Sequence, residues 1–239
     1  MEEREDKKCR KKLAYRAKKN NEDVKILCDL DINFKKFATG WIDKVQDSDT
    51  VFEKFIFLWF TFNSWLSLVV PDENKNDNDQ YLLHTIAASD RFDDRFDSLL
   101  GKDNQFAENA QELAAKGPVF RVIWMKNKGI DPWNQEEKER LSYVKMLYQM
   151  GPFLKTEHGP RAQFSPECAF KYHIKLGSQI PCDWLHIMHM IYQIRCNLFH
   201  GGKTYDSNRD ERFVTLAFNV LWPMFRLEGF IKNLELKNF

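Results

Sequence analysis

Residues 183–203 read DWLHIMHMIYQIRCNLFHGGK, a stretch that predicts one long helix with a defined end. Apolar residues recur through it at helical spacing. Two glycines, Gly201 and Gly202, follow directly and act as a stop signal. We therefore predict a helix from about Asp183 to His200.

The two sides of this predicted helix differ in polarity when residues are placed 100° apart. One broad side is apolar and holds Trp184, Ile187, Met188, Ile191, Leu198 and Phe199. The opposite side is polar and holds His186, His189, Gln193, Asn197 and His200. Arg195 falls in the middle of the apolar side, where a cation is costly unless it is paired. We expect either a buried carboxylate beside it, from Glu53, Asp183 or Glu211, or an interface at which a phosphate or a second subunit completes it.

The rest of the chain also favours helices. Periodicity, capping residues and glycine or proline stops predict helices over 32–46, 51–70, 81–100, 103–117, 134–150 and 207–233. Pro223 lies inside the last of these and should kink it, because proline removes a backbone donor. Residues 119–125 are β-branched and aromatic, which is typical of a short strand. Residues 151–181 carry several helix breakers and are interpreted as a long irregular insertion.

Composition favours one domain with a substantial core. The chain has 239 residues, of which 43% are hydrophobic and 14% aromatic. We predict an all-α helical bundle over 31–239, with an insertion around 72–180 before the 183–200 helix. Residues 1–30 form a basic lead-in, which could grip phosphate, although a solvated end is the simpler interpretation. The net charge is only +1, so any contact with nucleic acid must come from local patches.

Cysteine usage is typical of a reducing compartment. The five cysteines are odd in number and widely spaced, and no CxxC pair occurs, which indicates neither a disulfide framework nor a zinc ribbon. The charged N-terminus predicts no signal peptide and a cytoplasmic location. The apolar run 55–70 is too short and too interrupted to span a membrane, so we interpret it as a buried central helix and expect no membrane partner.

A zinc site is conceivable but not favoured. Cys182, His186 and His189 fall at helical spacing, with Cys168 and His173 upstream. Their spacing is irregular, so we predict a polar helix face and no metal. No glycine-rich loop that would cradle phosphates occurs, so the use of ATP or GTP is not expected and we predict no cofactor.

Arg195 and His200 offer the two groups that suffice to cut RNA without a metal: a cation for a phosphate and an imidazole for proton transfer. Residues i and i+5 lie about 140° apart around a regular helix, so the two side chains would not converge within one. They can meet if the helix ends near His200, or if a two-fold dimer brings the pairs of both protomers into one cleft. The spacing favours a composite site at a dimer boundary.

The pattern Arg195-x4-His200 at the end of such a helix resembles the signature of the HEPN superfamily. The wider stretch 195–203 resembles the form RNxLFHGGK of some defence-associated subfamilies, and Trp-Phe-Thr-Phe-Asn at 59–63 resembles the W-x-x-F-N of their first core helix. The resemblance covers 51–70 and 182–234. The sequence departs from the pattern at Cys196, where the family usually has Asn, Asp or His.

The resemblance implies a dimeric, metal-independent endoribonuclease that acts as a toxin or antiphage defence effector. Arg195 and His200 would be the catalytic pair, and cutting would proceed by attack of the ribose 2′-hydroxyl on the adjacent phosphorus. Asn197 and Lys203 are the expected substrate-binding residues, together with Asn63, which either approaches the site or bonds a backbone group. The expected partners are RNA, a second copy of the chain, and an antitoxin or other regulatory protein. The alternative is a non-catalytic helical dimer that binds RNA, a nucleotide or a protein partner.

Overall fold

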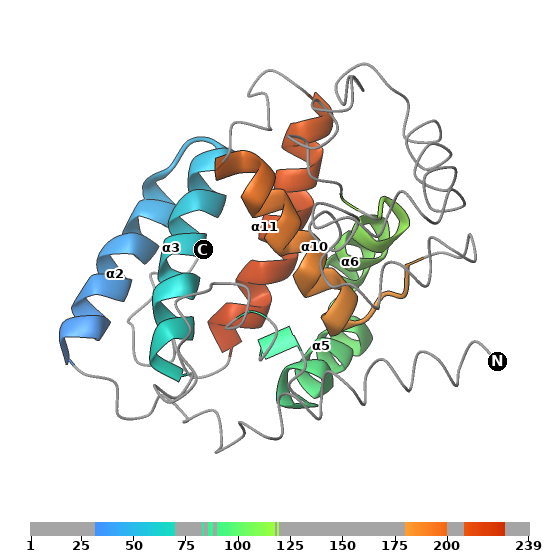
Figure 1. Ribbon diagram of the computed structural model, residues 1–239, viewed down its shortest axis with the longest axis horizontal. Helices are drawn as coiled ribbons and strands as arrows, with labels where there is room; N and C mark the ends of the chain where they lie inside the picture. The colour runs from blue at the N-terminus through green and yellow to red at the C-terminus, as the bar shows by residue number, and fades with distance from the viewer. Residues whose placement is uncertain are drawn as a thin grey trace, which may run out of the picture.

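The computed structural model describes residues 32–69, 83, 86, 87, 90–117, 119, 180–199 and 208–227 (Figure 1). Within these residues the chain forms six α-helices and no strand. They are α2 (Ile32–Asp47), α3 (Val51–Val69), α5 (Asp90–Lys102), α6 (Asn104–Ala115), α10 (Trp184–Phe199) and α11 (Asn208–Leu227). The prediction of an all-α fold is therefore confirmed.

The starts of α2, α3, α6, α10 and α11 lie within one residue of the predicted starts. α5, in contrast, begins at Asp90 instead of residue 81 and includes Gly101, which was expected to end it. Pro223 lies inside α11, as predicted. The lead-in 1–30, the helix predicted at 134–150 and the irregular stretch up to residue 179 lie outside the described residues. So does the predicted strand, except for Val119, which is not in a strand.

Side-chain caps explain where two of the helices begin. The Glu53 backbone N–H donates to Thr50 Oγ1 at 3.3 Å, and the Thr50 backbone N–H donates to Glu53 Oε2 at 3.2 Å. This reciprocal pair is a capping box at the start of α3. Asp103 caps α6 by accepting a hydrogen bond from the Phe106 backbone N–H at 3.0 Å. Because each cap satisfies otherwise orphaned backbone donors, these local residues set the helix starts.

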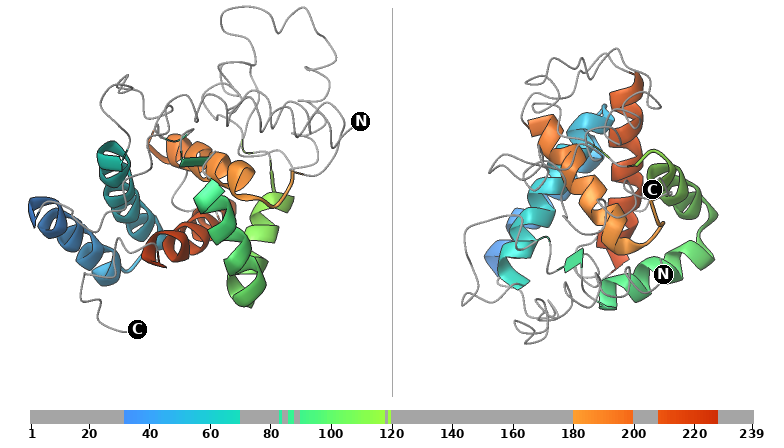
Figure 2. Two further views of the ribbon diagram at one scale, coloured as in Figure 1. Left: turned by 90° about the horizontal axis from the view of Figure 1, so that it is seen from below. Right: turned by 45° about the vertical axis from the view of Figure 1, so that its right-hand side comes forward.

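The helices form one connected bundle. α2 and α3 make an antiparallel hairpin, α3 packs on α11, and α11 packs on α6, which also contacts α5 (Figure 1). α10 crosses α11 and also contacts α5 and α6 (Figure 2). Rings of α3 meet rings of α10 as well, for example Trp59 and Tyr192 with centroids 6.1 Å apart. α10 therefore has neighbours on several sides.

The insertion predicted around 72–180 contains two helices that belong to the core. Phe92 and Phe96 of α5, and Phe106 and Leu113 of α6, are each at most 4% exposed. Over 90–117, therefore, this region is an integral part of the bundle and not a peripheral addition.

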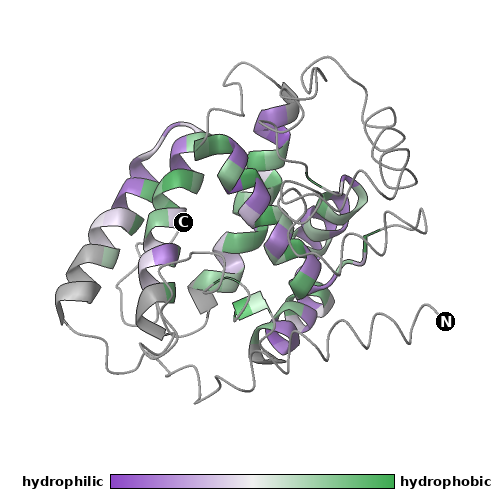
Figure 3. Cartoon of the chain, in the orientation of Figure 1, coloured by the Kyte–Doolittle hydropathy of each residue, from purple (hydrophilic) through white to green (hydrophobic). Residues whose placement is uncertain are grey.

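Aromatic side chains fill the centre of the bundle. Trp184 at the start of α10 stacks on Phe92, with centroids 5.8 Å apart, and its indole N–H donates to the carbonyl oxygen of Ile86 at 3.0 Å. Trp65 of α3 makes edge contacts with Phe92 and with Phe225 of α11. Hydrophobic residues thus gather where α3, α10 and α11 meet (Figure 3). Among the described residues, no helix has both the length and the apolar character needed to cross a membrane.

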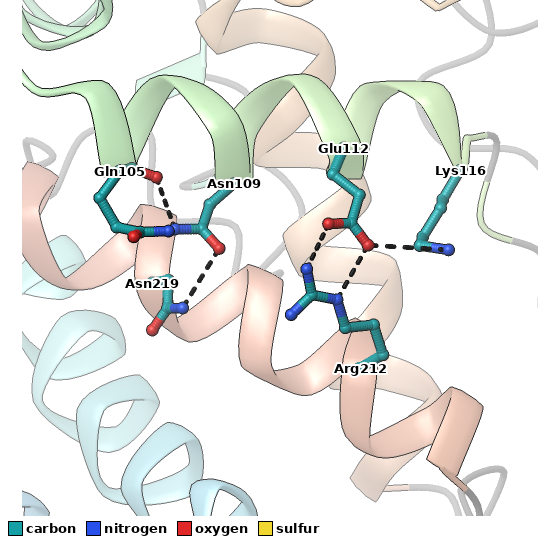
Figure 4. Close-up of polar contacts among 6 residues, drawn as sticks. All are labelled: Gln105, Asn109, Glu112, Lys116, Arg212 and Asn219. Atoms are coloured by element: carbon teal, nitrogen blue, oxygen red, sulfur yellow. Dashed lines mark hydrogen bonds and ion pairs between the residues drawn. The ribbon is translucent and has the colours of Figure 1, made fainter.

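A polar seam joins α6 to α11 (Figure 4). Arg212 makes a two-pronged ion pair with Glu112, with Nε donating to Oε1 at 2.8 Å and an Nη2 donating to Oε2. This hydrogen-bonded guanidinium lowers the pKa of Glu112 below its ordinary value. Farther along, the Asn219 amide donates to Asn109 Oδ1 at 3.2 Å. The seam fixes the register of two helices that lie far apart in the sequence.

Candidate functional site

The structure describes three of the five predicted site residues. Arg195 is half-buried near the C-terminal end of α10, Asn197 is buried on the same helix, and Asn63 is half-buried on α3. His200 and Lys203 lie outside the described residues, so the convergence of Arg195 and His200 stays a prediction.

The Asp183 side chain positions the helix that carries Arg195. Asp183 Oδ1 accepts a hydrogen bond from the His186 backbone N–H at 3.0 Å, and the same oxygen lies 2.7 Å from His186 Nδ1. The carboxylate therefore acts as N-cap of α10 and also holds a buried imidazole. Arg195 lies about three helical turns after this capped start of α10.

Aromatic rings surround the guanidinium of Arg195. Its Cζ lies 4.9 Å from the ring centroid of Phe199, 5.5 Å from that of Trp59 and 5.8 Å from that of Tyr192. These distances are within the cation–π range, in which the negative faces of the rings favour a cation. Tyr192 and Phe199 are three residues before and four residues after Arg195, so they share its face of the helix. The structure thus provides a fixed cation on an aromatic platform.

The carboxylates that the sequence suggested as partners of Arg195 have other positions. Asp183 caps the opposite end of α10, and Glu53 completes the capping box of α3. Glu211 is exposed in the first turn of α11. The cost of placing a cation on the apolar side is instead reduced by rings and by partial exposure to water. A weaker contact runs from Arg195 Nη1 to Cys196 Sγ, 3.9 Å away.

The polar side predicted for α10 is buried where the structure describes it. His186 and His189 are fully buried, and Gln193 and Asn197 are each 5% exposed. The physical reason is that α10 is covered by several neighbouring helices, so both of its sides face the interior. Its polar side chains bond along the helix instead, with Gln193 Nε2 donating to Asn197 Oδ1 at 3.0 Å.

Asn197 does not lie beside Arg195. Two residues along a regular helix correspond to a rotation of about 200°, so their side chains leave α10 on nearly opposite sides. The buried bond from Gln193 gives the Asn197 oxygen a structural use. Asn197, which was predicted to bind substrate, therefore does not share the side of α10 that carries Arg195.

Trp59 is the residue of the 59–63 motif whose ring contacts Arg195. Phe60 meets Phe199, with centroids 5.8 Å apart, and Trp59 meets Arg195. Asn63 lies one turn beyond Trp59 on the same face of α3. Sequence reasoning missed Trp59, Tyr192 and Phe199 as neighbours of the arginine. The i−3 and i+4 spacing could have identified the latter two, whereas Trp59 needed the packing of α3 on α10.

The conceivable zinc set is not assembled by the described residues. No group of three or more His, Cys, Asp or Glu side chains suited to a metal ion occurs among them. His186 is engaged with Asp183. Burial, reinforced by the nearby carboxylates of Asp183 and Asp97, raises the pKa of the Cys182 thiol to about 11. A thiol of such high pKa stays protonated near neutrality, which makes it a poor nucleophile and a poor metal ligand. Cys168 and His173 lie outside the described residues.

Comparisons with known protein families, with curated proteins and with solved structures find no match to this chain. The resemblance to the HEPN superfamily therefore rests on the two sequence motifs alone. What the structure adds is that these motifs touch, since Trp59 and Phe60 of one contact Arg195 and its neighbour Phe199 of the other.

Proposed function

We propose that this protein is a metal-independent endoribonuclease of the HEPN type. The observation that carries the proposal is the half-buried Arg195 guanidinium, held over Phe199 at the very end of α10. His200 follows Phe199 directly in the sequence. A cation and a titratable imidazole thus lie five positions apart in the sequence, and phosphodiester cleavage can use both groups.

The proposed reaction is a transesterification within RNA. The ribose 2′-oxygen attacks the adjacent phosphorus while its proton passes to a base, and the bond from phosphorus to the 5′-oxygen breaks as that oxygen takes a proton. The products are a 2′,3′-cyclic phosphate and a 5′-hydroxyl. His200 serves as the base or as the acid for the leaving oxygen, because an ordinary imidazole populates both forms near neutral pH. Arg195 binds the non-bridging oxygens as their negative charge grows.

In this proposal the active unit is a homodimer in the cytoplasm. Since positions 195 and 200 diverge on a regular helix, the arginine of one protomer and the histidine of its partner form each composite site. Lys203 adds a phosphate contact. A toxin or antiphage defence role, silenced by an antitoxin or similar regulator, fits the family that the motifs resemble.

A second function has one observation in its favour. Cys196 replaces the Asn, Asp or His that usually follows the arginine in the family, and it is buried at 4% exposure. A buried thiol cannot take the place of a polar group in the site. This favours a non-catalytic helical dimer that binds RNA, a nucleotide or a protein partner.

The experiment that separates the two functions is incubation of purified protein with mixed RNA at neutral pH in EDTA. We expect cleavage with cyclic phosphate ends by the wild type, and its loss in Arg195→Ala and His200→Ala. Arg212→Ala is the matched control, because it removes the same charge from an arginine whose side chain is 49% exposed. If the wild-type protein binds RNA but does not cut it, the non-catalytic function is favoured. Equal cleavage by wild type and His200→Ala rejects the proposed mechanism.

A further inference from the structure

A continuous series of aromatic rings leads away from Arg195 across three helices. Phe199 of α10 lies 5.8 Å from Phe60 of α3, and Phe60 lies 5.1 Å from Trp41 of α2, in both cases between ring centroids. We call these three residues the aromatic strip. Arg195 lies at one end of the strip, 4.9 Å from the centroid of Phe199.

The aromatic strip is open to solvent, unlike the aromatic core beneath it. Phe199 is 40% exposed, more than any other large hydrophobic residue in the part of the chain that the structure describes. Phe60 and Trp41 are partly exposed, whereas the neighbouring Trp59 is 1% exposed. Leaving these rings in contact with water forgoes the favourable burial that core rings such as Trp59 achieve.

The composition of this surface suits an unpaired nucleobase better than a second copy of the chain. A stable protein interface buries about 800 Å² on each partner, and one exposed ring with two partly exposed neighbours offers far less. A nucleobase, in contrast, needs only one or two ring faces on which to stack. The adjacent guanidinium complements the phosphate that every such base carries with it.

We propose that the aromatic strip is a stacking subsite that holds an unpaired RNA base while Arg195 holds the neighbouring phosphate. This inference rests on the proposed function and deepens it. Bases inside a duplex are already stacked and paired, so they cannot lie on these rings. The subsite therefore makes the protein select single-stranded segments, and it places the scissile phosphate by holding the base beside it.

The test measures binding of a short fluorescent oligouridylate to His200→Ala protein by anisotropy. We expect Phe199→Leu and Phe60→Leu each to weaken binding about fivefold to a hundredfold, because leucine keeps the apolar volume but has no π-face. Phe199→Trp should restore binding. The matched control is Phe218→Leu, since Phe218 is a partly buried phenylalanine of α11 that stacks on Trp222 instead. The same RNA annealed to its complement should bind more weakly than the single strand and should not respond to Phe199→Leu.

The outcomes separate this inference from the nuclease proposal. Unchanged oligouridylate affinity in Phe199→Leu overturns the subsite, even if the wild type cuts RNA. Weakened affinity in both leucine variants supports the subsite, even if no cutting is ever detected. If Phe199→Leu instead dissociates a dimer in sedimentation experiments while the RNA affinity of the protein is unchanged, the strip is a contact between copies and the inference is wrong.

Discussion

The guanidinium carbon of Arg195 lies 4.9 Å from the ring centroid of Phe199, one turn farther along the same helix. This pair lies at the C-terminal end of α10. Trp59 and Tyr192 also lie within cation–π distance of the guanidinium; Trp59 is buried, whereas Phe199 is exposed to water. The rings of Phe199, Trp59 and Tyr192 thus hold a planar guanidinium, the group best suited to paired contacts with a phosphate.

Arg195→Lys tests whether the planar guanidinium matters beyond its charge. We expect RNA cleavage in EDTA to fall by about a hundredfold or more, because an ammonium ion cannot make the same paired contacts with a phosphate. The free energy of unfolding should change by less than about 2 kcal/mol, the upper range of a cation–π contact. Initial rates and urea denaturation provide the two measurements. A large loss of stability with unchanged cleavage per folded molecule would show that Arg195 is structural.

Asp183→Ala should destabilise the protein through the start of α10. The carboxylate caps the helix and also contacts the His186 imidazole, so we expect a loss of about 1–2 kcal/mol in urea denaturation. Asp183→Asn keeps an oxygen that can cap the helix and removes only the negative charge beside the His186 imidazole. It should therefore lose clearly less stability than Asp183→Ala. Equal losses in both variants would mean that the charge, not the cap, is responsible.

The ion pair between Glu112 and Arg212 should contribute a small, pH-dependent stability. The folded-state pKa of Glu112 lies below the ordinary value of 4.5, so its contribution is present above that value and is lost as the pH falls through the folded-state pKa. Because both side chains are substantially exposed, we expect Glu112→Gln to cost less than about 1 kcal/mol at pH 7. Unfolding curves at several pH values and salt concentrations measure the difference. A difference between the two proteins that persists at pH 2 would contradict this assignment.

Gly117→Ala should be destabilising for a purely steric reason. An added Cβ would lie 2.9 Å from Ile180 Cγ1 and 3.0 Å from the end of the Met190 side chain, so the junction between α6 and α10 would have to shift. We expect a loss of about 1–3 kcal/mol, as for other overpacked sites. Gly40→Ala is the control, because nothing lies within 4 Å of the added atom in the middle of α2. That variant should gain up to about 1 kcal/mol from helix propensity. Similar thermal midpoints for the two variants would reject the steric explanation.

Much of the secondary structure could be predicted because its signals are local. Thr50 and Asp103 cap helices that begin within one residue of the predicted starts, and α10 ends one residue before the predicted His200. The polarity of α10 could not be predicted in the same way. His186 and Asn197 lie on the polar side of the helix, yet both are buried, because helices from distant parts of the chain cover that side.

Spacing along the chain was sufficient to predict the helices, and the same spacing could have predicted the rings three residues before and four residues after Arg195. These features depend on neighbours within about one helical turn. Packing between distant helices established that Trp59 lies against the arginine, that α5 and α6 belong to the core, and that Asn197 is enclosed away from Arg195. Such features arise because separate helices bury their apolar surfaces against one another. They therefore depend on residues far apart in the sequence, and no single stretch predicts them.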